Sequence, residues 1–288
     1  MSLIERALSK AREAGTAATP STEPASAGSA VPRREEGTVS GRTSDATVRV
    51  AMPRIAENPG LIITDALLSD AGLKPPLPQQ KQITAEYRHV KRRLLAEIQA
   101  GDASRTVLIA SALPGEGKSF SSANLAMSLA MEPDFTVLLI DADVIKPNLT
   151  RVFGMAGQAG LMDAASDDAV DVESLVVPTN VEGLSFLPAG RMNPNATEYF
   201  ASARMQEIFR QLLAVPGRLL VVDSLPLLLT TEARALAPLA GQVLLVVRAE
   251  STPRQAVLEA VNLLGDQANV KLLLNAAVRT KALAYLGY

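Results

Sequence analysis

From residue 106 onward, short and nearly continuous apolar runs alternate with helix-like stretches. The runs lie near residues 106–110, 136–140, 184–187, 218–222, 242–247 and 270–274. Between several of them apolar residues recur at helical spacing, most clearly over 120–131, 197–214 and 253–264. Strands that are apolar throughout and joined by helical crossovers predict an α/β fold, with a parallel sheet covered by helices on both faces.

The chain before residue 106 predicts three further parts. Residues 1–14 form a short amphipathic helix, in which Ser2 and Glu5 have the spacing of a capping box. Residues 15–52 are rich in Ala, Ser, Thr, Gly and Pro without periodicity, which indicates a disordered linker. Residues 53–105 contain a proline-rich break at 74–78 and then an amphipathic helix. The apolar face of that helix, over 83–99, carries Tyr87, Val90, Leu94, Leu95 and Ile98.

Charge and composition exclude several classes of function. The absence of cysteine excludes disulfides, thiolate zinc sites and cysteine nucleophiles. A formal net charge of −2 argues against a nucleic-acid partner, and we expect the basic residues of the 83–99 helix to form a solvated face (Arg88, Lys91, Arg92 and Arg93). No apolar run approaches about 18 residues, so we expect no transmembrane segment in the chain itself, and the absence of cysteine fits a cytoplasmic protein.

The loop over residues 112–119 reads Ala-Leu-Pro-Gly-Glu-Gly-Lys-Ser and joins the first apolar run to a helix-like stretch. A strand, a glycine-containing loop ending in Lys-Ser and a helix together cradle the phosphates of a nucleotide. Lys118 would supply a point charge for the β/γ oxygens, and the Ser119 hydroxyl could hold Mg²⁺. Backbone N–H groups and the helix dipole also favour phosphate here, so the predicted nucleotide ligands are Pro114, Gly115, Glu116, Gly117, Lys118, Ser119 and Phe120.

Carboxylates follow two later strands at the point where each apolar run ends. Asp141 and Asp143 come directly after the second run, and Asp223 follows the run at 218–222. In an open parallel sheet, ligands bind at the carboxyl ends of the strands. We therefore expect the phosphate loop and these three aspartates to converge on one site.

These motifs, in this order, resemble the bacterial tyrosine kinases of polysaccharide biosynthesis, within the wider group of MinD/ParA-like P-loop ATPases. The segments Tyr-Arg-His-Val-Lys-Arg-Arg-Leu-Leu at 87–95, Leu-Pro-Ala-Gly at 187–190 and Thr-Thr-Glu-Ala-Arg at 230–234 add to the resemblance. Together with the opening Met-Ser-Leu-Ile-Glu-Arg-Ala-Leu, they are similar to the subgroup associated with exosortase A and exopolysaccharide export.

The resemblance implies an ATP- and Mg²⁺-dependent tyrosine autokinase, with a kinase domain over residues 106–278. Lys118, Asp141 and Asp143 would be catalytic, and Ser119, Asp141 and Asp223 would hold the metal. Asn275 matches a position that contacts adenine in the wider group. Family members phosphorylate a C-terminal tyrosine cluster in trans within a ring of subunits, which implies a tail over 279–288 with acceptors Tyr285 and Tyr288. A separate transmembrane polysaccharide chain-length determinant or adaptor would hold the chain at the inner membrane.

The chain departs from the family pattern at specific positions. The Asp-x-Asp motif commonly continues to an Arg two residues later, where this chain has Ile145 and then Lys146. The Glu-x-x-Arg-x-x-Arg signature of subunit association begins with Ala85 and ends with Lys91.

Two alternatives to a kinase stay open at the level of sequence. One is a MinD/ParA-like ATPase switch, although its hallmark lysine would fall at Leu113. The other is a nucleotide-binding regulatory module of a membrane polysaccharide complex, with no transfer to tyrosine.

Overall fold

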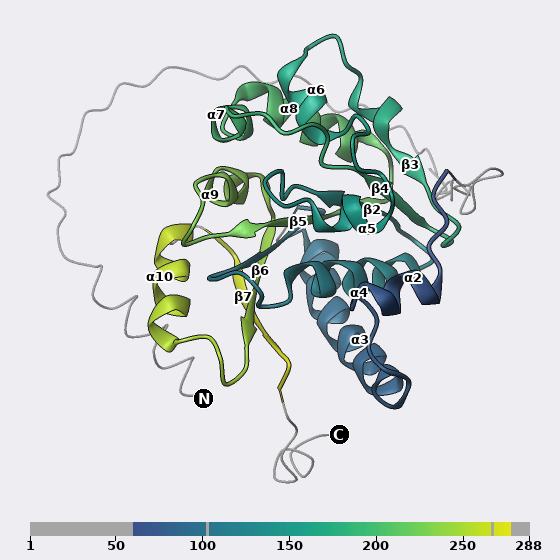
Figure 1. The fold of residues 1–288 in the computed structure, drawn as a ribbon, viewed down its shortest axis with the longest axis vertical. Coiled ribbons are helices and arrows are strands. Elements are labelled where there is room, and N and C mark those ends of the chain that lie inside the picture. The colour runs from purple at the N-terminus through teal and green to yellow at the C-terminus, as the bar shows by residue number, and fades with distance from the viewer. Residues whose placement is uncertain (1–59, 102–103, 266–267, 278–288) are drawn as a thin grey trace, which may run out of the picture. The chain divides into compact units, whose positions relative to one another are not determined.

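A seven-stranded sheet organises the computed structural model, which describes residues 60–101, 104–265 and 268–277 (Figure 1). The strand order is β3-β4-β2-β5-β1-β6-β7, and every neighbouring pair is parallel except β3 with β4. The strands are β1 (Thr106–Ser111), β2 (Thr136–Asp141), β3 (Val177–Pro178), β4 (Leu184–Leu187), β5 (Arg218–Pro226), β6 (Gln242–Arg248) and β7 (Val270–Asn275). The predicted parallel sheet is confirmed, and the short antiparallel edge strand β3 is an addition to it.

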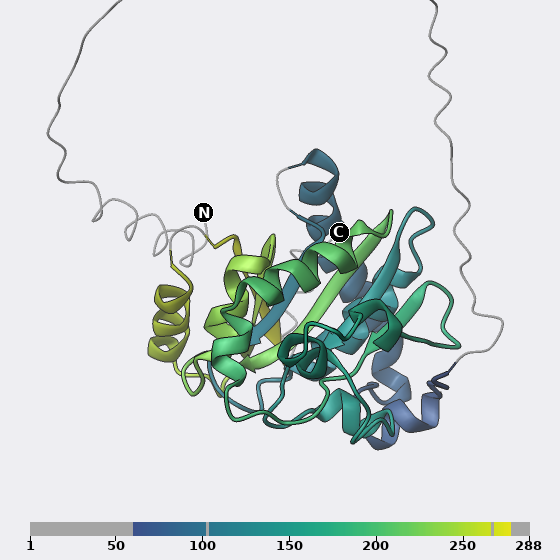
Figure 2. The same ribbon diagram turned by 90° about the horizontal axis from the view of Figure 1, so that it is seen from above.

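Helices pack on both faces of the sheet, as the apolar strands predict (Figure 2). One face is covered by α2 (Asp65–Asp70), α3 (Leu77–Ala100), α4 (Lys118–Ala130) and α5 (Asn148–Val152). The other is covered by α6 (Leu161–Ser166), α7 (Ala196–Phe200), α8 (Ala203–Ala214), α9 (Glu232–Leu236) and α10 (Arg254–Leu264). Alternate residues of β1 enter the two cores: Val107 and Ile109 face α3 and α4, while Leu108 and Ala110 face the opposite side.

Two predicted helices have different limits in the structure. The stretch at 197–214 is interrupted, because Ser202 is extended and its hydroxyl accepts the Met205 N–H at 3.2 Å, so that α8 starts anew with an N-cap. Helix α3 begins at Leu77 rather than near residue 83, since a proline in the first turn has no N–H to leave unpaired. The proline-rich run at 74–78 therefore starts a helix as well as ending a loop.

Lys91 is buried, which corrects the prediction of a solvated basic face on α3. The side chain is 8% exposed, and its Nζ donates to the Ser128 carbonyl at 2.8 Å and lies 2.6 Å from a Glu132 carboxylate oxygen. Ser128 lies in α4, and Glu132 follows that helix. Lys91 thus ties α3 to the helix that begins at the phosphate loop.

Replacing Lys91 with methionine is expected to lower the free energy of unfolding by about 1–3 kcal/mol, because the Ser128 carbonyl loses its charged donor. Denaturant unfolding measures the change. Lys81→Met on the exposed surface of the same helix is the matched control, with an expected change within about 0.5 kcal/mol. Equal stability of the two variants would contradict a structural role for Lys91.

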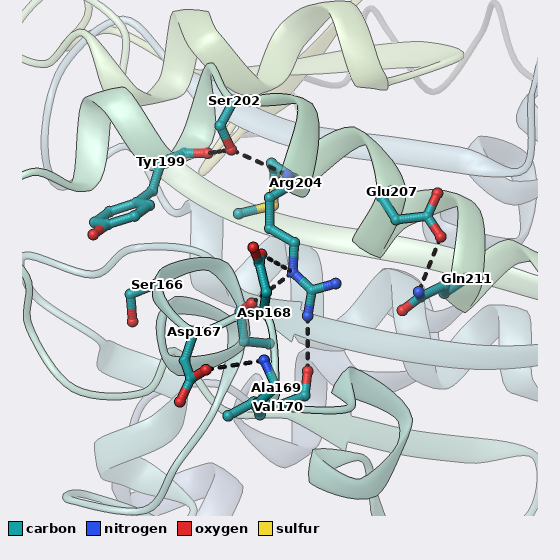
Figure 3. A network of polar contacts seen from close by, with 12 residues as sticks. Ser166, Asp167, Asp168, Ala169, Val170, Tyr199, Ser202, Arg204, Glu207 and Gln211 are labelled. Atoms are coloured by element: carbon teal, nitrogen blue, oxygen red, sulfur yellow. Dashed lines mark hydrogen bonds and ion pairs between the residues drawn. The ribbon is translucent and has the colours of Figure 1, made fainter.

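Arg204 on α8 is hydrogen-bonded both to α6 and to the segment that follows α6 (Figure 3). Its Nε donates to the Ala164 carbonyl at 3.0 Å and its Nη2 to the Val170 carbonyl at 2.8 Å, while Asp168 lies 3.4 Å from Nε. The Arg204 guanidinium therefore connects the backbone at Ala164 and at Val170 to α8.

Three predicted segments lie outside the described residues: the helix at 1–14, the linker at 15–52 and the tail at 279–288. Within the described residues, none of the helices combines the length and the apolar character needed to cross a bilayer.

Candidate active site

The phosphate loop ends at the N-terminus of α4, as predicted, although the helix begins two residues earlier, at Lys118. Gly117 precedes it as N-cap with φ 99°, and no side chain caps the first turn. The first backbone N–H groups of a helix have no partner inside it, so those of this turn are available to an anion. A Cβ added at Gly117 would lie 2.0 Å from the Asn275 Nδ2, so this position requires glycine.

Glu116 braces the loop from inside the protein. The side chain is buried, and its Oε2 accepts the Leu113 N–H at 2.9 Å while its Oε1 accepts the Thr252 hydroxyl. Its carboxylate is therefore turned away from the phosphate side. Of the predicted nucleotide ligands in the loop, Glu116 alone does not line the cavity described below.

Two residues from the C-terminal strands also hold the loop backbone. Arg248, the last residue of β6, donates from Nη1 to the Gly115 carbonyl at 3.1 Å. Asn275, the last residue of β7, donates from Nδ2 to the Glu116 carbonyl at 2.9 Å. The structure thus places Asn275 against the loop and off the cavity lining, and its predicted contact with adenine stays a prediction.

Asp223 lies beneath the loop and is paired in register with Asp141 on the neighbouring strand. Its Oδ1 accepts the Ser122 hydroxyl at 2.9 Å, whereas its Oδ2 is buried and has no hydrogen-bond partner among the described residues. Burial raises the pKa of Asp223, and the Ser119 hydroxyl and the Lys118 ammonium oppose that rise.

Asp141 is fully buried and holds the segment that follows it. Its Oδ2 accepts both the backbone N–H of Thr150 at 2.8 Å and the Thr150 hydroxyl at 2.9 Å, and its Oδ1 accepts the Asp143 N–H at 3.1 Å. Burial, and secondly the Asp223 carboxylate, raise the pKa of Asp141. A bound cation between these strands would relieve the repulsion.

Asp143, unlike Asp141, faces the cavity. It is half-buried, and its Oδ1 accepts the Lys146 N–H at 2.9 Å. Burial raises the pKa of Asp143, and the backbone N–H of Lys146 and the charge of Lys118 act in the opposite direction. The two aspartates of the Asp-x-Asp pair therefore differ in their surroundings. Asp141 fixes the segment after β2, and Asp143 faces the cavity.

A cavity of about 910 Å³ opens in front of the loop. It brings together Lys118, Ser119 and Asp143 from the predicted site with residues that were not predicted as ligands. The additional lining comes from the α2–α3 connection (Ala71, Gly72 and Leu73), from the segment after β2 (Ile145, Lys146, Asn148 and Arg151) and from the end of β5 and the turn that follows it (Leu225, Pro226, Leu229 and Thr230). A helix as short as the five-residue α5 shows too little periodicity to be predicted from sequence. The position of Arg151 at the cavity could therefore not be predicted either.

The residues present fit a divalent metal bound beside a nucleotide. The orphaned Asp223 Oδ2 is a carboxylate oxygen near Ser119, and hard oxygen ligands are those that Mg²⁺ takes. In the part of the chain that the structure describes, no three His, Cys, Asp or Glu side chains cluster into an all-protein metal cage. Mg²⁺ at nucleotide sites is held by one or two carboxylates together with phosphate oxygens, which agrees with this arrangement.

Known proteins are similar to this chain in sequence and in fold. Residues 102–216 match the ParA family model, described as NUBPL iron-transfer P-loop NTPase. The tyrosine-protein kinase CpsD of Streptococcus agalactiae is 30% identical over 184 residues, which cover 63% of this chain and 78% of CpsD. The crystal structure of the VpsO kinase domain matches with 31% identity and a TM-score of 0.60, covering 70% of this chain and 98% of that domain. The chain belongs to the bacterial tyrosine-kinase family.

Some relatives in this family are much longer than the present chain. The succinoglycan biosynthesis transport protein ExoP of Rhizobium meliloti is 37% identical over 161 residues, which are 55% of this chain and 20% of ExoP. The chain therefore spans about a fifth of the length of that relative. Membership of the tyrosine-kinase family implies a nucleotide site with a divalent metal, and the cavity in front of the phosphate loop has the residues for it.

Proposed function

We propose that this chain is an ATP-dependent protein-tyrosine autokinase of exopolysaccharide biosynthesis that phosphorylates its own C-terminal tail in trans, with Mg²⁺ as the metal. The observation that carries the proposal is the cavity in which Lys118, the N-terminus of α4 and the Asp143 carboxylate face one another. Phosphoryl transfer needs a phosphate cradle, a counter-charge and a group that receives the hydroxyl proton, and this cavity holds all three.

Each of these residues has a defined part in the transfer. The N–H groups of the loop and the Lys118 ammonium bind the phosphates and offset the charge that develops on the transferred group. Mg²⁺ would be held by Ser119 and Asp223, with Asp141 behind them, and supplies further neutralisation of the phosphate oxygens. Asp143 faces the cavity and would accept the proton of a tyrosine hydroxyl that reaches it.

The burial of the two tyrosines outside the tail favours the tail tyrosines as phosphate acceptors. The chain has four, of which Tyr285 and Tyr288 lie in the tail. Tyr87 is 7% exposed, and burial raises the pKa of its phenol to about 12, so it is unsuited as an acceptor. Tyr199 on α7 is half-buried and packs against the core.

Incubation of the full chain with ATP and Mg²⁺, followed by intact-mass and peptide analysis, tests the proposal. Wild type is expected to gain phosphate on the tail, and the double variant Tyr285→Phe/Tyr288→Phe is expected to lose more than about 90% of it, since phenylalanine has no acceptor hydroxyl. Tyr199→Phe is the matched control and is expected to keep wild-type incorporation.

The same experiment separates the alternatives. Release of ADP without any modified tyrosine would identify an ATPase switch, and neither product would identify a regulatory module. Mixing Lys118→Met chains, which retain their tails, with wild type tests transfer in trans: phosphate on the inactive chain is the expected outcome.

We further propose that the chain acts at the inner membrane through a transmembrane partner of the chain-length determinant or adaptor type, and as a homo-oligomer. The support is the similarity to ExoP, which is named as a transport protein of succinoglycan biosynthesis. Transfer in trans also requires a second copy within reach of the first.

A further inference from the structure

The segment that follows Asp143 contributes two positively charged side chains, Lys146 and Arg151, to the lining of the cavity. The proposed function gives neither of them a role. Ile145, Lys146 and Arg151 all line the cavity, and Ile145 is 46% exposed at the position where the family pattern has an arginine. The guanidinium expected there is thus absent, and the nearest guanidinium along the chain is that of Arg151 in α5.

The two aspartates of the Asp-x-Asp pair fix this segment at both ends. Asp143 accepts the Lys146 N–H at 2.9 Å and closes the turn at its start. Asp141 accepts the N–H and the hydroxyl of Thr150 at 2.8 and 2.9 Å, which fixes α5 at its centre. The Thr150 hydroxyl in turn accepts the Ala189 N–H at 3.0 Å, so the helix is anchored to the end of β4 as well.

Arg151 follows Thr150 directly, and its orientation is set locally. Its Nη2 donates to the Asn148 Oδ1 at 2.8 Å, while the residue is exposed and lines the cavity. A guanidinium has five N–H donors in a planar fork that matches phosphate oxygens, whereas an ammonium such as that of Lys146 acts as a point charge. The buried Asp141 carboxylate thus anchors α5, and Arg151 extends from this anchored helix into the cavity lining.

We infer that Arg151, which lines the same cavity as the phosphate loop, binds the γ-phosphate of the nucleotide, and that Thr150 is its positioning residue. This inference rests on the proposed function, because it assigns a residue to the triphosphate in the same cavity. Lys118 and the N-terminus of α4 would hold the phosphates, and the Arg151 guanidinium would add a contact to the terminal phosphate. Selectivity for ATP over ADP follows, since ADP has no group that reaches Arg151.

Equilibrium binding of two nucleotides to the full chain tests the assignment, with Mg²⁺ present: ADP and the non-hydrolysable β,γ-imido analogue of ATP. Arg151→Ala is expected to lower the affinity for the analogue by about 10- to 100-fold, the range for a charge-assisted hydrogen bond. Its affinity for ADP is expected to stay within about twofold of wild type. Arg151→Lys is expected to recover part of the loss. Arg191→Ala is the matched control, because Arg191 is an exposed arginine that pairs with Asp163 and does not line the cavity.

Thr150 is tested with a pair of variants. Thr150→Val removes the hydroxyl and is expected to reproduce the analogue-selective loss, whereas Thr150→Ser keeps the hydroxyl and is expected to bind both nucleotides as wild type does. A purely structural role would weaken ADP and the analogue equally and would not distinguish them.

Equal weakening of both nucleotides by Arg151→Ala, or no weakening of either, would overturn the inference. So would an analogue-selective loss in Lys146→Ala that is absent from Arg151→Ala. These outcomes are separate from the proposed function, which stands or falls on phosphate incorporation into the tail of the wild-type chain.

Discussion

Replacing Lys118 with methionine is expected to lower the rate of tail phosphorylation by about 10²- to 10³-fold, the usual effect of removing one preorganised group that stabilises transition-state charge. Lys118 is the first residue of α4, is 8% exposed and lines the cavity, so its ammonium lies in a partly dry site where charge is poorly screened. Methionine keeps the length of the side chain and removes the charge. Incorporation of phosphate per minute, measured by intact mass, gives the rate.

Two controls separate the loss of the phosphate contact from a general loss of charge or of folding. Lys81→Met changes an exposed lysine on α3 and is expected to keep the wild-type rate. Thermal unfolding of Lys118→Met is expected to remain cooperative, since the Lys118 ammonium donates no hydrogen bond to another described residue, while Asp223 and Asp143 lose a nearby positive charge. A Lys118→Met chain that is folded and still phosphorylates its tail at more than about a third of the wild-type rate would rule out the proposed phosphate contact.

Replacing Asp143 with asparagine is expected to lower the transfer rate by about 10²- to 10⁴-fold, the contribution of a positioned general base. The asparagine oxygen can still accept the Lys146 N–H, so the turn after β2 is preserved while the basic carboxylate is lost. Affinity for ADP is expected to be no weaker than in wild type, because the change removes a negative charge from the phosphate side of the cavity.

Asp167→Asn is the matched control for Asp143→Asn. Asp167 accepts a local backbone N–H, that of Ala169 at 2.9 Å, but it is exposed and lies beside the Arg204 network rather than in the cavity (Figure 3). Its substitution is expected to leave both rate and affinity unchanged. Undiminished transfer by Asp143→Asn would show that another group receives the tyrosine proton.

The positions of Lys118 and the aspartates at one edge of the sheet could be predicted because their signals are local. Lys118, Asp143 and Asp223 each follow a buried apolar run, and parallel strands place their carboxyl ends at one edge of the sheet. The burial of Lys91, by contrast, could not be predicted from local signals. A basic run on an amphipathic helix gives no sign of which of its members meets a carbonyl on another helix, since Ser128 is 37 residues away.

The division of labour between the two aspartates of the Asp-x-Asp pair depends on contacts that have no pattern in sequence. Asp141 bonds Thr150 nine residues later, and this bond depends on a five-residue helix too short to show periodicity. Glu116 likewise turns inward because Thr252, from the β6–α10 connection, meets its carboxylate. These contacts arise only when distant segments are packed together.

The sequence by itself determined the α/β class, the phosphate loop at 112–119 and the strand ends that carry the carboxylates. Apolar periodicity and loop chemistry are local properties of the chain, and they suffice for these features. Only the tertiary structure decided which carboxylate faces the cavity, that Lys91 is buried and that Arg151 reaches the cavity. The physical reason is that burial and the pairing of polar groups are set by neighbours far apart in sequence, because a buried charge must find a partner wherever the fold supplies one.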